Sequence, residues 1–232
     1  MYLVTTSNTI KVIFMNIFYD ANKIYEAGTK AIQGAPFKYQ SQLFEMNHLI
    51  ETAQILKDLK APYAMNRLLQ GEVGSGKTIV AIISIMAVVS GGYQAVLMCP
   101  TEILSKQHYQ TISQILKNDK EVKIGLLTGS TPLKQRKEMI EKIASGDIHI
   151  IIGTHALFQK DIDYYKLGIV IADEEHRFGV RQRVLIKNKG LDVNYLKMSA
   201  TPIPRSLAIS AYGDTDISII QTCLLYTSPS PR

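Results

Sequence analysis

The sequence predicts an α/β fold in which a parallel β-sheet is flanked by helices. Short apolar runs alternate along the chain with stretches compatible with helix, a pattern typical of a parallel sheet that is buried on both faces. A glycine-rich stretch, GEVGSGKT at residues 71–78, lies between one apolar run and one helical stretch. The chain has 232 residues, which suits one large domain or two small ones, and the 46% of hydrophobic residues is enough to build a core.

The expected elements follow in chain order. A helix is expected at residues 43–60, where apolar residues recur at helical spacing. Further helices are expected at residues 77–90 and at residues 100–118, where an initial Pro-Thr favours helix entry and Ile103, Leu104 and Ile112 are expected to face the core. Seven apolar runs are expected to be strands: residues 67–70, 95–99, 123–127, 148–153, 167–173, 195–200 and 216–220.

Composition and charge narrow the functional classes. The net charge of +6 is compatible with a polyanionic partner but does not require one. Two cysteines, Cys99 and Cys223, form no disulfide framework, so a reducing cytoplasm is expected, and no signal peptide is evident. The apolar segment 79–90 ends at Gly91-Gly92, short of the roughly 20 residues that a membrane span needs, and a buried helix is expected instead.

The glycine-rich stretch fits the phosphate-loop pattern G-x-x-x-x-G-K-[ST]. Its glycines let backbone N–H groups curl round phosphates, and the N-terminus of the following helix adds a partial positive charge. Lys77 is expected to hold the β- and γ-phosphates of a nucleotide, and Thr78 to bind Mg²⁺. A tight glycine turn without a ligand is the alternative. The predicted nucleotide-binding residues here are Gly71, Gly74, Ser75, Gly76, Lys77 and Thr78.

An acidic cluster ends the apolar run at residues 167–173. Asp173 is expected to reach Mg²⁺, directly or through water, and Glu174 to polarise the attacking water. A solvated acidic loop is the alternative reading of this cluster alone. His176 is expected to lie near the γ-phosphate with a coupling role, or else to be a buried structural histidine. A kinase needs no such glutamate because its nucleophile is the substrate, so Glu174 favours hydrolysis.

Several further blocks resemble the motifs of superfamily 2 helicases. Ser199-Ala200-Thr201 resembles motif III, DEEH resembles the DExH box, and CPTEILSKQH, LLTGS and GTHAL resemble neighbouring motifs. Residues 62–220 resemble most closely the RecG family of ATP-dependent branched-DNA translocases, through blocks such as DEEHRFGVRQR and SATPIPRSLAISAYGDTDIS. The Mfd family of transcription-repair coupling factors is the second resemblance, since it shares DEEHRFGV and TPIPR.

The resemblance implies a single P-loop NTPase lobe of the RecA-like type over residues 37–222. It implies that Ser199 and Thr201 couple hydrolysis to movement. The DNA-backbone contacts that it implies are Thr101, Gly129, Ser130 and Thr154. The implied partners are double-stranded and branched DNA, in fork and Holliday-junction remodelling for recombination and repair, together with a second RecA-like lobe and a wedge domain.

The chain also departs from the family. The glutamine that reads adenine aligns with Gln42 or with His48, and the box reads DEEH where RecG more often has DEQH. Nothing after Ile220 resembles a second lobe, and residues 1–36 are too few for a wedge domain, so they are expected to be a linker or the end of an upstream domain. Residues 223–232 read like a translated sequencing adapter or, alternatively, a Ser/Pro linker. By itself the chain is therefore either a very weak ATPase or a nucleotide-binding module without turnover.

Overall fold

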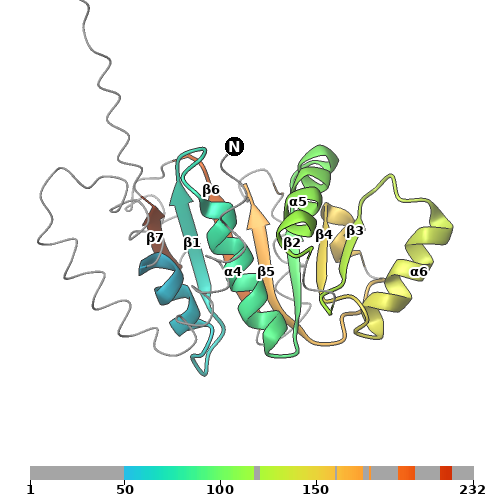
Figure 1. Ribbon diagram of the computed structural model, residues 1–232, viewed down its shortest axis with the longest axis horizontal. Coiled ribbons are helices and arrows are strands. Elements are labelled where there is room, and N and C mark those ends of the chain that lie inside the picture. The colour runs from blue at the N-terminus through green and yellow to red at the C-terminus, as the bar shows by residue number, and fades with distance from the viewer. Residues whose placement is uncertain are drawn as a thin grey trace, which may run out of the picture.

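The computed structural model describes residues 50–117, 121–159, 161–174, 178, 193–201 and 215–220. Within them the chain forms a seven-stranded sheet in which every pair of neighbouring strands is parallel (Figure 1). The strands are β1 (Asn66–Gly71), β2 (Gln94–Met98), β3 (Ile124–Leu127), β4 (Ile150–Gly153), β5 (Leu167–Asp173), β6 (Asn194–Ser199) and β7 (Asp216–Ile220). The predicted α/β class is confirmed, and each of the seven expected apolar runs forms one of these strands.

The helices are α4 (Lys77–Ser90), α5 (Glu102–Ile115) and α6 (Leu133–Ala144), with a short 3-10 helix η1 (His155–Phe158). Residues 50–58 are also helical, which agrees with the helix expected at residues 43–60 as far as the described residues extend. Residues 59–60 form a turn, and residues 43–49 lie outside the described residues.

Two hydrophobic cores cover the two faces of the sheet, which explains why the strands read as continuous apolar runs. On β2, Leu97 packs into the core that also contains residues of α4 and α5. Its neighbours Val96 and Met98 point to the opposite face and pack into the core that contains Ile143 of α6 and residues of η1. Because side chains alternate between faces along a strand and both faces are covered, both alternating sets have to be apolar.

The most apolar helix, α4, is 14 residues long, and its six consecutive residues 80–85 are all buried, so it is covered on every side there. No helix in the described part of the chain is long and apolar enough to cross a membrane. The buried helix expected at residues 79–90 is therefore confirmed as part of α4.

The expectation that Ile103 faces the core is wrong. In α5, Ile112 is fully buried and Leu104 packs partly against the core, but Ile103 is 79% exposed. Ile103 precedes Ile112 by nine residues, which is about two and a half turns of an α-helix, so the two side chains lie on opposite sides. The eight-residue spacing of Leu104 brings it much closer to the side of Ile112.

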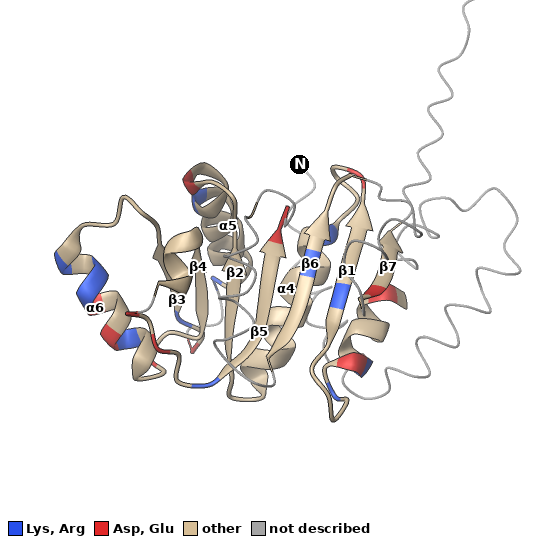
Figure 2. Cartoon of the chain, turned by 180° about the vertical axis from the view of Figure 1, so that it is seen from behind, with Lys and Arg blue, Asp and Glu red and all other residues tan. Residues whose placement is uncertain are grey.

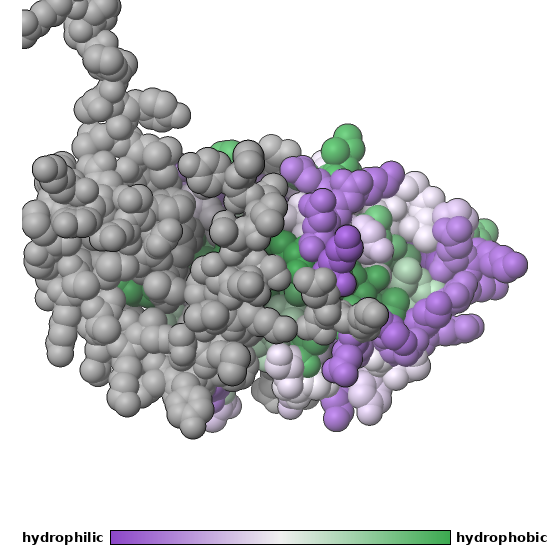
Figure 3. Space-filling model, in the orientation of Figure 1, coloured by the Kyte–Doolittle hydropathy of each residue, from purple (hydrophilic) through white to green (hydrophobic). Residues whose placement is uncertain are grey.

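Helix α6, which the sequence analysis did not name separately, is the most polar of the three long helices. It buries Ile143, and basic and acidic residues occupy much of its remaining length (Figure 2). Hydrophilic residues gather over it in the space-filling view (Figure 3). This pattern is typical of a helix that covers the margin of a sheet and faces solvent on its outer side.

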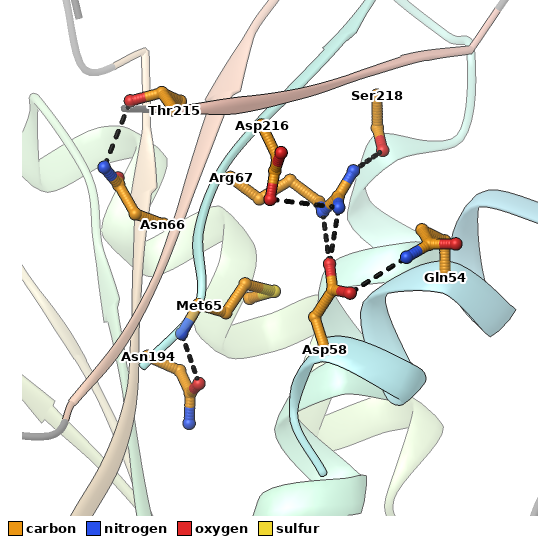
Figure 4. Close-up of polar contacts among 9 residues, drawn as sticks. All are labelled: Gln54, Asp58, Met65, Asn66, Arg67, Asn194, Thr215, Asp216 and Ser218. Carbon is orange, nitrogen blue, oxygen red and sulfur yellow. Dashed lines mark hydrogen bonds and ion pairs between the residues drawn. The ribbon is translucent and has the colours of Figure 1, made fainter. Parts of the chain in front are cut away.

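A buried arginine near the start of β1 connects three elements (Figure 4). Arg67 of β1 donates from Nε to Oδ2 of Asp58 at 2.8 Å and from Nη1 to Oγ of Ser218, on β7, at 2.9 Å. Its Nη2 also forms an ion pair of 3.4 Å with Asp216. Asp58 accepts a further hydrogen bond from Gln54, so the end of the helix at residues 50–58 is held against β1 and β7.

The order of the strands divides the sheet into two halves. The sheet runs β3-β4-β2-β5-β6-β1-β7. Strands β5, β6 and β1 are consecutive, and they carry the acidic cluster, the Ser-Ala-Thr block and the phosphate loop at their carboxyl ends. Strands β3, β4 and β2 are also consecutive, and the four predicted DNA-contact residues follow their carboxyl ends. Ligands of open parallel sheets bind at this edge.

Candidate nucleotide and nucleic-acid site

The phosphate loop connects the end of β1 to the start of α4. Gly74 and Gly76 have φ values of 81° and 86°, a left-handed conformation that favours glycine. The ammonium of Lys77 turns back into the loop and donates to the carbonyl oxygens of Gly71 and Glu72 at 2.6 and 2.8 Å. Gly76 is the N-cap of α4, with no side-chain cap and no acidic residue in the first turn, so the backbone N–H groups at this helix end suit an anion.

The acidic pair lies at the end of β5. Asp173 is the last residue of the strand, and Glu174 adopts a φ of 50°, a left-handed conformation that is uncommon outside glycine. The carboxylate of Glu174 accepts a hydrogen bond of 3.2 Å from the backbone N–H of Ala200. This contact joins the DEEH box to the Ser-Ala-Thr block that follows β6.

Ser199 and Thr201 lie together at the end of β6. Their hydroxyl oxygens are 2.9 Å apart, and the Thr201 backbone N–H donates to Ser199 Oγ at 3.3 Å. The structure therefore brings these two predicted residues next to the loop that carries Glu174.

The phosphate loop and the acidic pair act on each other electrostatically. Burial lowers the pKa of Lys77, and the negative charges of Glu174 and then Asp173 oppose that shift. The ammonium of Lys77 is therefore close enough to both carboxylates to be attracted by them.

The donor set fits a magnesium ion. Mg²⁺ takes oxygen ligands and usually keeps several waters, with one or two ligands from the protein and others from substrate phosphates. Thr78, in the first turn of α4, and Asp173 offer one hydroxyl and one carboxylate at the same edge of the sheet. Among the described residues no group of three or more His, Cys, Asp or Glu side chains is placed to hold a metal ion.

Three of the four predicted DNA-contact residues, Thr101, Gly129 and Ser130, already form hydrogen bonds within the chain. Thr101 caps α5, because its side chain accepts from the backbone N–H of Leu104 at 3.3 Å. Ser130 donates from its backbone N–H to Oε1 of Glu102 at 2.9 Å, and its hydroxyl donates to Oε2 of the same carboxylate. These hydrogen bonds, with Lys106 and the backbone N–H of Gly129, lower the pKa of Glu102, and the side chain of Ser130 has the largest effect.

Thr154 follows β4 and is buried, and its hydroxyl has no hydrogen-bond partner among the described residues. Three other predicted residues, Gln42, His48 and His176, lie outside the described residues.

Sequence reasoning missed one residue at the nucleotide end. Nε2 of His108, on α5, lies 3.0 Å from Oδ2 of Asp173, and the two side chains are only 12% and 15% exposed. Cys99 is fully buried at the start of the loop that leads to α5, and burial raises the pKa of its thiol to about 12. His108 ends the block CPTEILSKQH, but nothing local indicates that α5 returns this side chain to the end of β5.

A family model described as DEAD/DEAH box helicase matches residues 22–209. The chain belongs to the DEAD/DEAH box helicase family. Among curated members, it is 53% identical over 195 residues to the ATP-dependent DNA helicase RecG of Aquifex aeolicus (strain VF5), which covers 82% of this chain and 24% of the relative. It is 52% identical over 167 residues to the RecG of Streptococcus pneumoniae serotype 4, with 72% of this chain and again 24% of the relative covered.

Solved structures agree with this membership. A structure of RecG bound to a three-way DNA junction superposes on this helicase chain with a TM-score of 0.66 and 38% identity, over 84% of this chain and 25% of that one. A DEAD box protein from Methanococcus jannaschii has a TM-score of 0.58 at 21% identity over 75% of this chain and 49% of that one, which supports the fold alone. The RecA-like class predicted from the sequence is confirmed. The chain spans about a quarter of the length of the curated relatives that it matches.

Proposed function

We propose that this chain is the first motor lobe of a RecG-like DNA helicase, which hydrolyses Mg²⁺–ATP to remodel replication forks and Holliday junctions during recombination and repair. The observation that carries the proposal is the placement of three motifs on consecutive strands. The phosphate loop, the DEEH box and the Ser-Ala-Thr block follow β1, β5 and β6, and the Glu174–Ala200 hydrogen bond joins the last two.

The phosphate loop would bind the triphosphate. The backbone N–H groups around Gly74 and Gly76 and the open N-terminus of α4 would surround the phosphate oxygens. The ammonium of Lys77 would leave the carbonyl oxygens of Gly71 and Glu72 and bind the β- and γ-phosphates. Gln42 or His48 would contact the adenine, and His176 would lie near the γ-phosphate.

The acidic pair would carry out hydrolysis. Bound Mg²⁺ neutralises charge that develops on the phosphates, and Thr78 and Asp173 would hold it. Glu174 would accept a proton from the attacking water, because its carboxylate stands at the end of β5 beside Asp173. The Glu174 carboxylate also accepts a hydrogen bond from the backbone N–H of Ala200, which lies between Ser199 and Thr201. A movement of Glu174 would therefore shift these two residues directly. This link would couple hydrolysis to movement on DNA.

The other half of the edge would hold one DNA strand by its phosphates. Thr101, Gly129, Ser130 and Thr154 follow neighbouring strands, and hydroxyl and backbone N–H groups bind phosphates without reading bases. Binding by phosphate contacts weakens steeply as salt is added.

Full activity would need parts beyond this lobe. Arginine fingers that stabilise the transition state contribute about 10³–10⁵ in rate in the systems where they are measured. In RecG-like motors the second lobe would supply them and the wedge domain would engage the branch point. We therefore expect the chain alone to bind Mg²⁺–ATP and to turn it over very slowly or not at all.

The first experiment measures binding of a fluorescent ATP analogue and release of phosphate from ATP, with and without branched DNA. Wild-type chain is expected to bind the analogue in the presence of Mg²⁺, and Lys77→Ala is expected to lose this binding. Ile103→Ala serves as the matched control, because Ile103 is exposed and lies outside the phosphate loop.

The outcomes separate the alternatives. Binding without turnover above that of Lys77→Ala would identify a half-site that needs its second lobe. DNA-stimulated turnover that Lys77→Ala abolishes would indicate that a second copy supplies the missing arginines. Absence of any nucleotide binding that depends on Lys77 would overturn the proposed function.

A further inference from the structure

Helix α5 connects the two halves of the carboxyl edge. It starts after β2 with Thr101 and Glu102, which lie in the predicted nucleic-acid half. Two turns later its His108 meets Asp173, which ends β5 in the nucleotide half. Strands β2 and β5 are neighbours in the sheet, so the loop after one and the end of the other lie side by side.

The chemistry of the contact assigns the direction of the hydrogen bond. An ionised aspartate only accepts hydrogen bonds, so the hydrogen of this 3.0 Å contact belongs to Nε2 of His108. The bond occupies Oδ2 of Asp173 and leaves Oδ1 to face another group. Both side chains are mostly buried, so water competes little for this bond.

Two charged or ionisable groups near Asp173, Cys99 and Lys77, do not orient its carboxylate by a hydrogen bond. Burial raises the pKa of the Cys99 thiol to about 12, so this group carries no charge that could hold the Asp173 carboxylate. The positive charge of Lys77 attracts the Asp173 carboxylate from the phosphate loop. Lys77 nevertheless donates its hydrogen bonds to carbonyl oxygens of that loop and not to Asp173. His108 is therefore the side chain that the described structure provides to orient the Asp173 carboxylate.

We propose that His108 is a positioning residue for the magnesium ligand of this lobe: its Nε2–H holds one oxygen of Asp173 so that the other is presented to Mg²⁺ or to a water of the bound ion. The proposal rests on the function proposed above and adds to it a residue that touches neither nucleotide nor metal. Hydrogen-bond partners of metal-ligating side chains fix their orientation, and losing such a partner typically costs about 10–100-fold in metal affinity.

The test measures how much Mg²⁺ the chain needs to bind a fluorescent ADP analogue. The affinity for the analogue is measured across a Mg²⁺ titration and again in EDTA, for wild type, His108→Ala and His108→Gln. Gln107→Ala is the matched control, because Gln107 is the exposed neighbour on the same helix. Binding of Mn²⁺ in the presence of the analogue, followed by electron paramagnetic resonance, reports on the metal without any catalytic turnover.

His108→Ala is expected to need about 10–100-fold more Mg²⁺ to reach the same affinity, while its affinity in EDTA stays at the wild-type value. His108→Gln, whose amide can donate to the same carboxylate oxygen, is expected to restore most of the loss. Gln107→Ala is expected to match wild type throughout.

Two results would overturn the proposal while leaving the proposed function intact. One is a Mg²⁺ requirement in His108→Ala equal to that of wild type. The other is an equal loss of affinity in EDTA and in Mg²⁺, accompanied by a lower Tm and seen in His108→Gln as well, which would make His108 a structural tie only. If wild type itself binds no nucleotide, the proposed function fails and the role of His108 fails with it.

Discussion

Helices α4 and α5 begin at the same edge of the sheet, and their N-termini are built in opposite ways. The N-terminus of α4 has a glycine N-cap, no side-chain cap and no acid in its first turn, and it is followed at once by Lys77. The N-terminus of α5 is capped by the side chain of Thr101 and carries Glu102 in its first turn. One end can therefore accept an anion, whereas the other already has the backbone N–H of Leu104 bonded to its cap and adds a negative charge.

Two helix N-termini at the same edge of one sheet can therefore differ in whether they bind an anion. On the α4 side, the positive end of the helix and a lysine prepare a site for phosphates. On the α5 side, Glu102 holds the N–H and hydroxyl of Ser130, the groups that the sequence analysis assigned to a DNA phosphate. The carboxylate occupies the position of an anion there, so DNA would have to displace it.

The largest expected effect concerns the support beneath the α4 side. Arg67→Met would leave Asp58 mostly buried without its partner, and removing one member of a buried ion pair costs about 3–5 kcal/mol of unfolding free energy. Asp216→Asn is the matched control, since Asp216 pairs with the same arginine but its side chain is 71% exposed. Urea denaturation checks both variants. Equal destabilisation of the two would contradict the view that Arg67 is held mainly through Asp58 and Ser218.

A second pair of variants tests the α5 side. Ile112→Ala should destabilise the chain by about 2–5 kcal/mol, because it opens a cavity in the core. Ile103→Ala, on the same helix but 79% exposed, should change the unfolding free energy by no more than about 0.5 kcal/mol. Thermal denaturation of the two variants measures the contrast. A large loss in Ile103→Ala would show that this side chain is covered in solution.

A smaller effect is expected when the negative charge at the N-terminus of α5 is removed. Glu102→Gln removes the negative charge beside Ser130 while keeping the shape of the side chain, and it should strengthen binding of branched DNA by a small amount, because an exposed charge contributes little. The gain should shrink as salt is added. Glu138→Gln on α6 is the matched control. It removes the same charge from an exposed glutamate that pairs with Lys142 and not with Ser130. Fluorescence anisotropy with labelled DNA gives the affinities, and weaker binding by Glu102→Gln would refute the competition.

The smallest expected effect is a pH dependence. Burial raises the pKa of Glu51 in the folded chain, and a hydrogen bond from Ser218 and the charge of Arg67 oppose the rise only in part. The folded state then binds the proton more tightly than the unfolded state, so this residue costs stability as the pH rises through its raised pKa. Glu51→Gln should therefore raise the Tm near neutral pH and leave it unchanged well below the ordinary glutamate pKa. A lower Tm near pH 7 would mean that the attraction of Arg67 outweighs burial.

The sequence alone predicted every strand of the described sheet, and most plainly β2, β4 and β5, which are buried on both faces and almost entirely apolar. It also predicted the phosphate loop, since glycines with left-handed φ angles next to Lys77 leave a local pattern. Ile103 shows the limit of such patterns. Its apolar character is local, but whether it is buried depends on which side of α5 meets the sheet.

What only the tertiary structure decided is which distant residues become neighbours. The strand order β3-β4-β2-β5-β6-β1-β7 divides the motifs into a nucleotide half and a nucleic-acid half, and this order comes from crossovers that join strands far apart in the chain. The contacts of His108 with Asp173 and of Arg67 with Ser218 connect residues 65 and 151 positions apart. Spacing along a chain determines the period of an element and the chemistry of a loop, but packing of one element on another determines which side chains meet.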